Sequence, residues 1–463
     1  MNKNIIQTIL SSTIIKTDSF QSLQLSPNDW IIPSIHSISC VYFYNIQKWS
    51  LYEKESNDMF IDIQQLIVSL RKLLEYYSLL NGVFKLFDQD SKVAIEQTDS
   101  KGGILFVTAT VNISLNELPL SLEKYTNVNV IPKELQLINA NDPNTLFHVR
   151  HTRFLCGSVA LGISLNHQVA DAHSYFQLVK DWVQIYKNLE YQPDVCHQRS
   201  LLEPSFNEIE ILKKTNPNFN DRKSLSVKEE NSPSFPQTKQ IKMKIFRFSA
   251  DELNRMKLDS THHLSPNVDY VSTFDVLTAH IYRHVMIARN YPASSISKLY
   301  ISTNIRSRLT QPSIPITYFG NAIMFSYLEM NMKELIHENH IGLLASEVHR
   351  AIEQNNKDDI RTTLAWILCQ KNKKLISPTC NLDKTDFTIS AWNKMGMYSD
   401  SDFEPGVYPC RITLPADTEF SGAAILFSTE QNDASIDVIL GLEMSEMERV
   451  EKNFDFRKYH VEI

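Results

Sequence analysis

One stretch of the sequence decides the fold: Cys156-Gly157-Ser158-Val159-Ala160-Leu161-Gly162-Ile163-Ser164-Leu165-Asn166-His167-Gln168-Val169-Ala170-Asp171. Apolar residues alternate in it, which is typical of a strand with one buried face, and we expect a single long strand over Arg153–His167. The spacing changes to three and four residues between Leu178 and Leu189, which predicts a helix. His167 therefore stands at the end of a strand, accessible on a fixed backbone, and is a candidate general base.

Asp171 follows His167 by four residues, and the pair leaves several interpretations open. The carboxylate orients the imidazole, or it points away and braces the turn. A lone His-x-x-x-Asp also occurs by chance as a capping or solvated pair. It fits half of a metal site, but no third ligand stands at a suitable spacing. The other histidine pair, His262 and His263, stands in a polar segment, and we interpret it as surface.

The composition is that of a folded, globular protein. The 463 residues suggest two to four domains at roughly 100–200 residues each. Hydrophobic residues make up 43% and charged residues 21%, which excludes a disordered chain. The net charge of -7 argues against a nucleic-acid-binding surface. The 11 glycines are too few for a collagen-like chain or one dominated by glycine loops.

The six cysteines and the apolar runs indicate the compartment. No two cysteines form a C-x-x-C, so neither a zinc ribbon nor a thioredoxin-type site is expected, and the number is ordinary for a reducing compartment. No apolar run reaches the ~20 residues that span a bilayer. We identify no signal peptide, retention signal or lipidation motif. We therefore expect a cytoplasmic protein with no membrane partner.

A polar, proline-containing segment between Pro193 and Gln240 divides the chain into nearly equal halves. We predict an N-terminal domain over residues 1–195, a linker over 196–240 with a short helix near 207–214, and a C-terminal domain over 241–463. Both halves show strands followed by helices, which favours an α/β or α+β fold with two sheets. The other predicted elements are helices at 64–77 and 273–289, strands at 102–111, 241–248, 298–304 and 423–428, and a capping box from Ser249 to Glu252.

Several segments, in order along nearly the whole chain, resemble the BAHD acyl-CoA-dependent acyltransferases. One is similar to the family's S-T-F-E-A-L-S-A-H-I-W-R helix, and two others to its N-x-R-x-R and Y-F-G-N motifs. The stretch that ends in His167 and Asp171 resembles the family's H-x-x-x-D motif. The matching segments, those of the first three motifs included, are Leu25–Asp29, Pro33–His36, Val41–Tyr44, Leu73–Gly82, Gly103–Val107, Ser272–Asp275, Ala279–Arg283, Asn304–Arg308 and Tyr318–Asn321.

This resemblance implies two chloramphenicol-acetyltransferase-like α/β domains, each a mixed sheet with flanking helices, joined by a long crossover loop. It implies a channel through their interface, entered by acyl-CoA from one face and by a small alcohol or amine from the other. His167 is then the general base. Asp171 is structural, although Ala172 stands where the family has glycine. The resemblance implies no metal, no permanently bound cofactor, no covalent acyl-enzyme and a monomer.

The family's D-F-G-W-G motif matches only in part. Here Asp402-Phe403-Glu404-Pro405-Gly406 replaces its Gly-Trp with Glu-Pro, and this change puts the geometry toward CoA in doubt. The resemblance implies that Asp402 pairs with Arg306 across the interface. Upstream, Trp392 matches the tryptophan of the T-S-W motif, whose indole N–H stabilises the oxyanion in hydroxycinnamoyltransferases. A core tryptophan is the alternative.

The acceptor side resembles the shikimate and quinate hydroxycinnamoyltransferases. His36 stands where a histidine touches an acceptor hydroxyl, and Ser390 stands where an acceptor-pocket threonine lies. The arginine that binds an acceptor carboxylate is missing before Ser390, so a shikimate-type acid is doubtful. An amine, a sugar or a neutral alcohol is equally open. For the acyl group we favour a hydroxycinnamoyl type over acetyl.

Two rival functions remain at this point. A carrier-protein-dependent condensation domain shares the fold, but that family usually pairs two histidines before the aspartate, and position 166 here is asparagine. An inactive acyl-CoA or metabolite binder is the other rival, which the presence of His167, Asp171 and Trp392 argues against.

Overall fold

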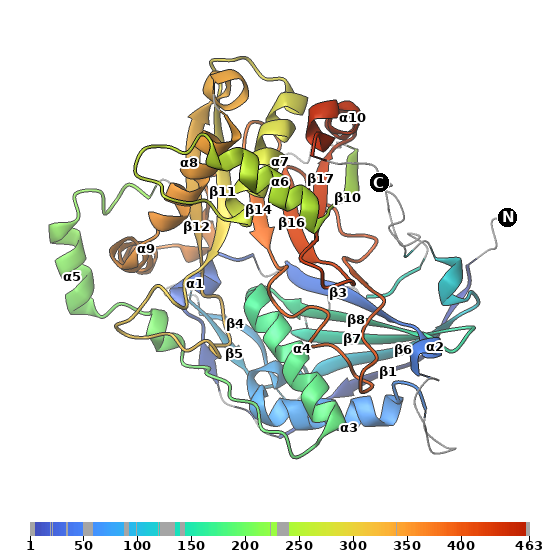
Figure 1. Ribbon diagram of the computed structural model, residues 1–463. Helices are drawn as coiled ribbons and strands as arrows, with labels where there is room; N and C mark the ends of the chain where they lie inside the picture. The colour runs from blue at the N-terminus through green and yellow to red at the C-terminus, as the bar shows by residue number, and fades with distance from the viewer. Residues whose placement is uncertain are drawn as a thin grey trace.

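The computed structural model describes residues 5–18, 20, 22–33, 36–49, 59–87, 92–98, 100–118, 120, 135–138, 144–222, 224–228, 240–338 and 340–459. Two six-stranded mixed sheets, each with helices packed on it, make up the two halves of the protein (Figure 1). The first sheet lies in the lower half of Figure 1 and the second sheet in the upper half. The predicted α/β class with mixed sheets is confirmed.

The first sheet has the strand order β1-β6-β7-β8-β3-β15, the second β10-β17-β16-β14-β11-β12, and β2-β5-β4 and β13-β9 form two small sheets. The strands are β1 (Gln7–Ile15), β2 (Leu23–Gln24), β3 (Ser37–Tyr44), β4 (Val83–Phe87), β5 (Lys92–Glu96), β6 (Ile104–Val111), β7 (Phe147–Phe154), β8 (Val159–Asn166), β9 (Leu225–Val227), β10 (Ile241–Phe248), β11 (Ile296–Asn304), β12 (Ile323–Asn331), β13 (Ile376–Pro378), β14 (Phe387–Ala391), β15 (Arg411–Thr413), β16 (Ala423–Ser428) and β17 (Ile436–Glu443).

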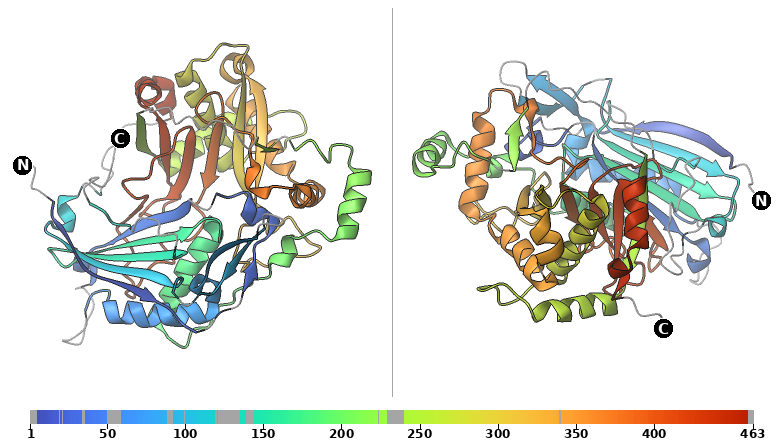
Figure 2. Two further views of the ribbon diagram at one scale, coloured as in Figure 1. Left: turned by 180° about the vertical axis from the view of Figure 1, so that it is seen from behind. Right: turned by 90° about the horizontal axis from the view of Figure 1, so that it is seen from above.

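Helices cover each sheet, and Figure 2 shows the two groups from behind and from above. α3 and α4 pack together against the first sheet, and α6, α7, α8 and α10 pack together on the second. The helices are α1 (Pro27–Trp30), α2 (Ile46–Trp49), α3 (Ile63–Tyr76), α4 (Ala172–Lys187), α5 (Phe206–Thr215), α6 (Ala250–Thr261), α7 (Thr273–Arg289), α8 (Ile341–Glu353), α9 (Lys357–Cys369) and α10 (Met444–Lys452).

The long strand predicted over 153–167 is wrong. The chain instead forms an antiparallel pair, β7 and β8, joined by a turn at residues 155–158. Gly157 adopts a φ of 87° in this turn, a conformation that glycine reaches without steric cost. Leu155, which a single strand would place on the same buried face as Val159 and Leu161, is 72% exposed. Alternation alone did not reveal the turn, because apolar residues stand on both sides of it.

The predicted elements of the second half match the structure closely. β10, α7 and β16 have the predicted bounds, and the capping box from Ser249 to Glu252 is present. α7 lies buried between its neighbours, and its apolar stripe includes Leu277, Ile281 and Val285. In the linker, the predicted short helix is α5, and β9 pairs with β13 of the second half.

One strand of the first sheet comes from the second half of the chain. β15, which lies within the predicted C-terminal domain, pairs antiparallel with β3 and forms an edge of the first sheet. The buried side chain of Arg411 at its start lies 2.9 Å from Asp437 on β17, which also pairs with Arg247 on β10 at 2.7 Å. The two halves are therefore joined by a strand as well as by the linker.

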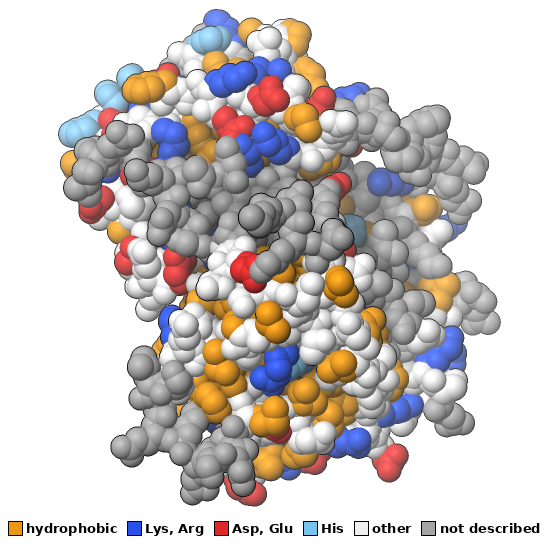
Figure 3. All heavy atoms as spheres, turned by 90° about the vertical axis from the view of Figure 1, so that its right-hand side faces the viewer, with side chains coloured by type: hydrophobic (Ala, Val, Ile, Leu, Met, Phe, Trp, Pro, Cys, Tyr) orange, Lys and Arg blue, Asp and Glu red, His pale blue; other side chains and the backbone are white. Residues whose placement is uncertain are grey.

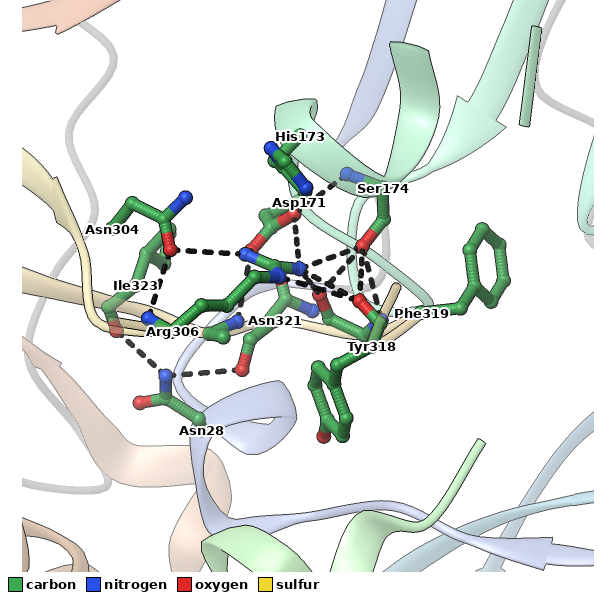
Figure 4. A network of polar contacts seen from close by, with 12 residues as sticks. Asn28, Asp171, His173, Ser174, Asn304, Arg306, Tyr318, Phe319, Asn321 and Ile323 are labelled. Atoms are coloured by element: carbon green, nitrogen blue, oxygen red, sulfur yellow. Dashed lines mark hydrogen bonds and ion pairs between the residues drawn. The ribbon is translucent and has the colours of Figure 1, made fainter. Parts of the chain in front are cut away.

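The aspartate that follows His167 forms a buried ion pair between the halves, drawn in Figure 4. The Asp171 carboxylate accepts hydrogen bonds from both terminal nitrogens of Arg306, at 2.8 and 3.0 Å, and from the backbone N–H of Ser174 and Ala322. Its bond with Ser174 caps the N-terminus of α4. Burial opposes ionisation, but the Arg306 charge and these hydrogen bonds hold the pKa of Asp171 below its ordinary value.

The predicted pair between Asp402 and Arg306 is wrong. Asp402 instead lies 2.9 Å from the ammonium of Lys187, the last residue of α4. Arg306 is engaged by Asp171, at the opposite end of the same helix. Both aspartates therefore hold α4, one at each end, and only the Asp171 pair is almost completely enclosed.

The Glu-Pro departure in the 402–406 segment has a clear structural role. The Glu404 carboxylate accepts hydrogen bonds from the indole N–H of Trp49, the backbone N–H of Ile61 and the hydroxyl of Tyr186. These donors lie on or beside α2, α3 and α4 in the first half. Glu404 therefore ties this segment of the second half to the first, where the family pattern has a glycine.

The surface in Figure 3 carries many hydrophobic side chains over its lower half, where the first sheet lies. Exposed apolar residues of the edge strand β1 include Ile9, Leu10 and Ile14. His262 and His263 follow the end of α6 and are exposed, as the sequence predicted. Among the helices of the described residues, none has the length and apolar character needed to cross a bilayer.

We expect the two aspartates of α4 to differ in their effect on stability. Asp171→Ala leaves the buried Arg306 guanidinium without its carboxylate and should lower the free energy of unfolding by about 3–5 kcal/mol. Asp402→Ala removes a more exposed ion pair and should cost about 1 kcal/mol or less. Urea denaturation of both variants measures this difference. Equal losses would contradict the assignment of Arg306 to Asp171.

Candidate active site

His167 lies directly after β8, at the point where the first sheet meets the second half. Its backbone N–H donates to the carbonyl of His36 at 2.9 Å, which continues the pairing of β8 with β3 beyond both strands. The imidazole is half-buried. Its Nδ1 is enclosed and has no hydrogen-bond partner within the described part of the chain. The ring is thus held on an ordered strand end with one nitrogen shielded from solvent.

The surroundings of His167 favour the neutral imidazole. Burial is the main cause of the lowered pKa of His167, and the nearby His36 lowers this pKa further. The backbone of His167 itself, the Asp171 charge and the carboxamide of Asn321 oppose the shift, but the net direction is downward. A neutral imidazole at pH 7 has a free lone pair, which a general base requires.

Side chains from distant segments hold three consecutive carbonyls of the loop after β8. The Asn321 Nδ2 donates to the carbonyl of His167 at 2.9 Å and to that of Gln168 at 3.3 Å. The Arg199 guanidinium donates to the carbonyl of Val169 at 2.9 Å. Asn321 precedes β12 and Arg199 lies in the predicted linker, so the loop is fixed from outside its own sheet.

Both of these side chains are oriented by Asp29 in α1, whose carboxylate is completely buried. One oxygen, Oδ1, accepts from the backbone N–H and the Nδ2 of Asn321 at 3.0 and 2.9 Å. The other, Oδ2, lies 3.0 Å from Arg199 Nε and accepts from the N–H and hydroxyl of Ser26. A single carboxylate therefore orders both side chains that hold the His167 loop.

His36, the predicted acceptor contact, lies immediately before β3 and beside His167. Its side chain is exposed, while its backbone carbonyl accepts the N–H of His167. The preceding positions 34 and 35, which belong to the resemblance at this segment, lie outside the described residues. The structure thus brings His36 and His167 together from two neighbouring strands.

Trp392 follows β14 of the second sheet and packs toward the first half. Its ring stacks on Phe427 at 5.4 Å between centroids and meets the edge of Phe176 on α4 at 5.8 Å. The indole N–H donates to the hydroxyl of Ser390 at 3.0 Å. The two residues that the sequence singled out near β14 are therefore hydrogen-bonded partners, and they face the helix that begins just after the His167 loop.

The sequence missed the roles of Asp29 and Asn321. Both stand in segments that resemble the acyltransferase family. The spacing of apolar residues, however, does not show which partner a buried polar side chain binds. The signal was their type: an aspartate and an asparagine inside apolar segments must find hydrogen bonds when they are buried. Asp402, in contrast, was singled out and lies at the far end of α4 from the His167 loop.

No group of three or more His, Cys, Asp or Glu side chains in the described ranges is arranged to hold a metal ion.

The fold and sequence resemble acyl transfer enzymes over almost their whole length. The chain is 27% identical over 447 residues to shikimate O-hydroxycinnamoyltransferase of Nicotiana tabacum, covering 93% of this chain and 94% of the relative. It is 24% identical over 439 residues to an Avena sativa hydroxycinnamoyl-CoA:5-hydroxyanthranilate N-hydroxycinnamoyltransferase, covering 92% of this chain and 93% of the relative.

Among solved structures, F. graminearum TRI101 complexed with ethyl coenzyme A superposes with a TM-score of 0.74 at 16% identity, over 95% of this chain and 98% of that one. This likeness extends over both sheets. The model of the Transferase family matches residues 6–457. The chain therefore belongs to the Transferase family, the BAHD acyl-CoA-dependent acyltransferases.

Proposed function

We propose that this enzyme transfers a hydroxycinnamoyl-type acyl group from its CoA thioester to a hydroxyl or amine of a small metabolite, with His167 as the general base. The observation that carries the proposal is the placement of His167. Its imidazole stands on a fixed strand end, with Nδ1 enclosed, a lowered pKa and its loop held by buried side chains. Relatives named for hydroxycinnamoyl transfer support the acyl class.

In this proposal Nε2 is the nitrogen that meets the acceptor. It takes the proton of the acceptor O–H or N–H while the acceptor oxygen or nitrogen attacks the thioester carbonyl carbon. The carbonyl oxygen becomes an oxyanion in the tetrahedral intermediate. Collapse re-forms the carbonyl and breaks the carbon–sulfur bond, and the proton held by His167 neutralises the CoA thiolate as it leaves.

Trp392 is our candidate for the oxyanion donor. Its indole N–H is the polar group of an otherwise apolar side chain, packed between Phe427 and Phe176. In the structure this N–H donates to the hydroxyl of Ser390. During the reaction the indole N–H would replace this hydrogen bond with one to the developing oxyanion. A charged acceptor makes the stronger hydrogen bond, so the exchange favours the transition state over the ground state.

His36 and Ser390 are our candidates for the acceptor pocket. His36 is exposed beside His167, where a hydroxyl or amine must approach the base. Relatives are named for both O- and N-acylation, so both acceptor types belong in the proposal. We further propose that the enzyme acts as a monomer with no permanently bound cofactor.

The experiment is a thiol-release assay with the purified enzyme. p-Coumaroyl-CoA, caffeoyl-CoA and acetyl-CoA are each combined with a neutral alcohol, an aromatic amine, a sugar and a shikimate-type acid, and products are identified by mass spectrometry. We expect faster CoA release with a hydroxycinnamoyl donor than with acetyl-CoA. Acceptor-dependent release with acetyl-CoA alone would remove the hydroxycinnamoyl part of the proposal. If none of the donors releases CoA with any of the acceptors, the proposed function is rejected.

His167→Ala should lower kcat by at least ~100-fold, because general-base catalysis contributes roughly 100- to 10,000-fold. The wild-type enzyme should lose kcat/KM only below pH 6.5, since burial lowers the pKa of His167 from that value and the base acts in its neutral form. Circular dichroism and thermal melting of the variant control for folding. An active, folded His167→Ala enzyme contradicts this assignment.

Trp392→Phe keeps an aromatic ring but removes the N–H, and should lower kcat by about 100- to 1,000-fold with little change in either KM. The matched control is Trp182→Phe on α4. Trp182 is also buried and donates to a serine hydroxyl, that of Ser69 at 2.9 Å. This control should lower stability without a comparable loss of kcat. A Trp392→Phe enzyme that changes only the KM for the donor would place the indole in the CoA channel.

A further inference from the structure

His167 is linked to the buried Asp29 through one carboxamide, that of Asn321. The chain of contacts starts at Asp29 Oδ1, which accepts from Asn321 Nδ2 at 2.9 Å. The same Nδ2 donates to the carbonyl of His167 at 2.9 Å. Asn321 and Asp29 are both completely buried, so neither contact competes with solvent. Figure 4 shows Asn321 beside Arg306 and Asn28.

Asp29 determines which way the Asn321 amide points. A carboxylate oxygen accepts hydrogen bonds and does not donate them, so the NH₂ end of the amide must face Asp29. The oxygen end is thereby turned away from Asp29. That oxygen, Oδ1, is buried and has no hydrogen-bond partner among the described residues.

Nδ1 of His167 is likewise enclosed and without a hydrogen-bond partner within the described part of the chain. Two acceptors near the imidazole raise the pKa of His167: the backbone of His167 itself, whose carbonyl Asn321 Nδ2 holds at 2.9 Å, and the Asn321 carboxamide. An acceptor beside Nδ1 keeps the ring proton on that nitrogen. The lone pair then lies on Nε2, which is the form that a base at Nε2 requires.

We propose that Asn321, oriented by Asp29, is the positioning residue of His167: its Nδ2 holds the carbonyl of His167, and its Oδ1 is the side-chain acceptor available to Nδ1. This rests on the proposed role of His167 as the base. Asp171, four residues after the histidine, has no such position, since its carboxylate is occupied by Arg306 and the first turn of α4. The carboxamide thus has the orienting role that a carboxylate has in many His-dependent sites.

The test compares Asn321→Ala with a matched control, Asn28→Ala. Asn28 is also completely buried, and its Nδ2 donates to the carbonyls of Asn321 and Ile323 at 3.1 and 2.6 Å, but it makes no hydrogen bond with His167. Both variants remove a buried amide at the same place. We expect similar falls in melting temperature from the two.

Only Asn321→Ala should change the chemistry. We expect kcat with p-coumaroyl-CoA to fall about 10- to 100-fold with both KM values within about twofold, as for a misplaced catalytic group. The acid limb of kcat/KM should move to lower pH, because the acceptor that raises the pKa of His167 is gone. If Asn321→Ala does not fold, Asn321→Leu preserves the volume and removes the same hydrogen bonds.

A double-variant cycle separates this inference from the proposed function. In the His167→Ala background, adding Asn321→Ala should lower the residual rate by less than twofold, because the group that it positions is absent. If His167→Ala is inactive while Asn321→Ala keeps the wild-type kcat and pH profile, the positioning role is wrong and the base remains. If Asn321→Ala and Asn28→Ala lower kcat equally, Asn321 is only structural. If His167→Ala is fully active, the proposed function itself fails.

Discussion

The carboxylate of Asp171 is the point on which the rest of the structure depends. Its two oxygens accept four hydrogen bonds, two from Arg306 and one each from the backbone N–H groups of Ser174 and Ala322. The first pair joins the two halves, the bond with Ser174 starts α4, and the bond with Ala322 fixes the segment that enters β12. A charge buried this completely is stable only with all of these partners in place. The same carboxylate therefore fixes the position of the His167 loop, the direction of α4 and the placement of the second half against the first.

Asp29 and Asp171 bind different groups around His167. Asp171 binds the helix and Arg306 after the loop, while Asp29 binds the two side chains, from Asn321 and Arg199, that hold the carbonyls of the loop itself. Neither carboxylate makes a hydrogen bond with the imidazole. Both carboxylates therefore act on the base through the loop and through other side chains, and not by direct contact with the ring.

Periodicity predicted the helices and most strands because burial of one face leaves a pattern in local sequence. β10, α7 and β16 were correct in their bounds for this reason. The strand over 153–167 was wrong because a tight turn at Gly157 needs only a few residues and does not interrupt the apolar pattern. The pairing of Asp402 with Arg306 was wrong for a different reason. An ion pair across a domain interface depends on where two helices and two loops end in space, and no local pattern carries that information.

The partial D-F-G-W-G match and β15 belong to the same crossing segment. The segment leaves the second half, is held by Glu404 against α2 and α4, and then adds β15 to the free side of β3. This arrangement sets the order in which the protein is completed on the ribosome. When the linker emerges, the first sheet still has an open edge along β3, with Val41, Tyr42 and Phe43 unpaired on that side until residues 411–413 arrive. When residues 411–413 have been made, the second sheet is also unfinished, because β16 and β17 follow β15 in the chain and the edge strand β10 pairs with β17. The first sheet therefore cannot be completed before most of the second half has been synthesised, so the chain must keep an apolar sheet edge from aggregating for most of its synthesis.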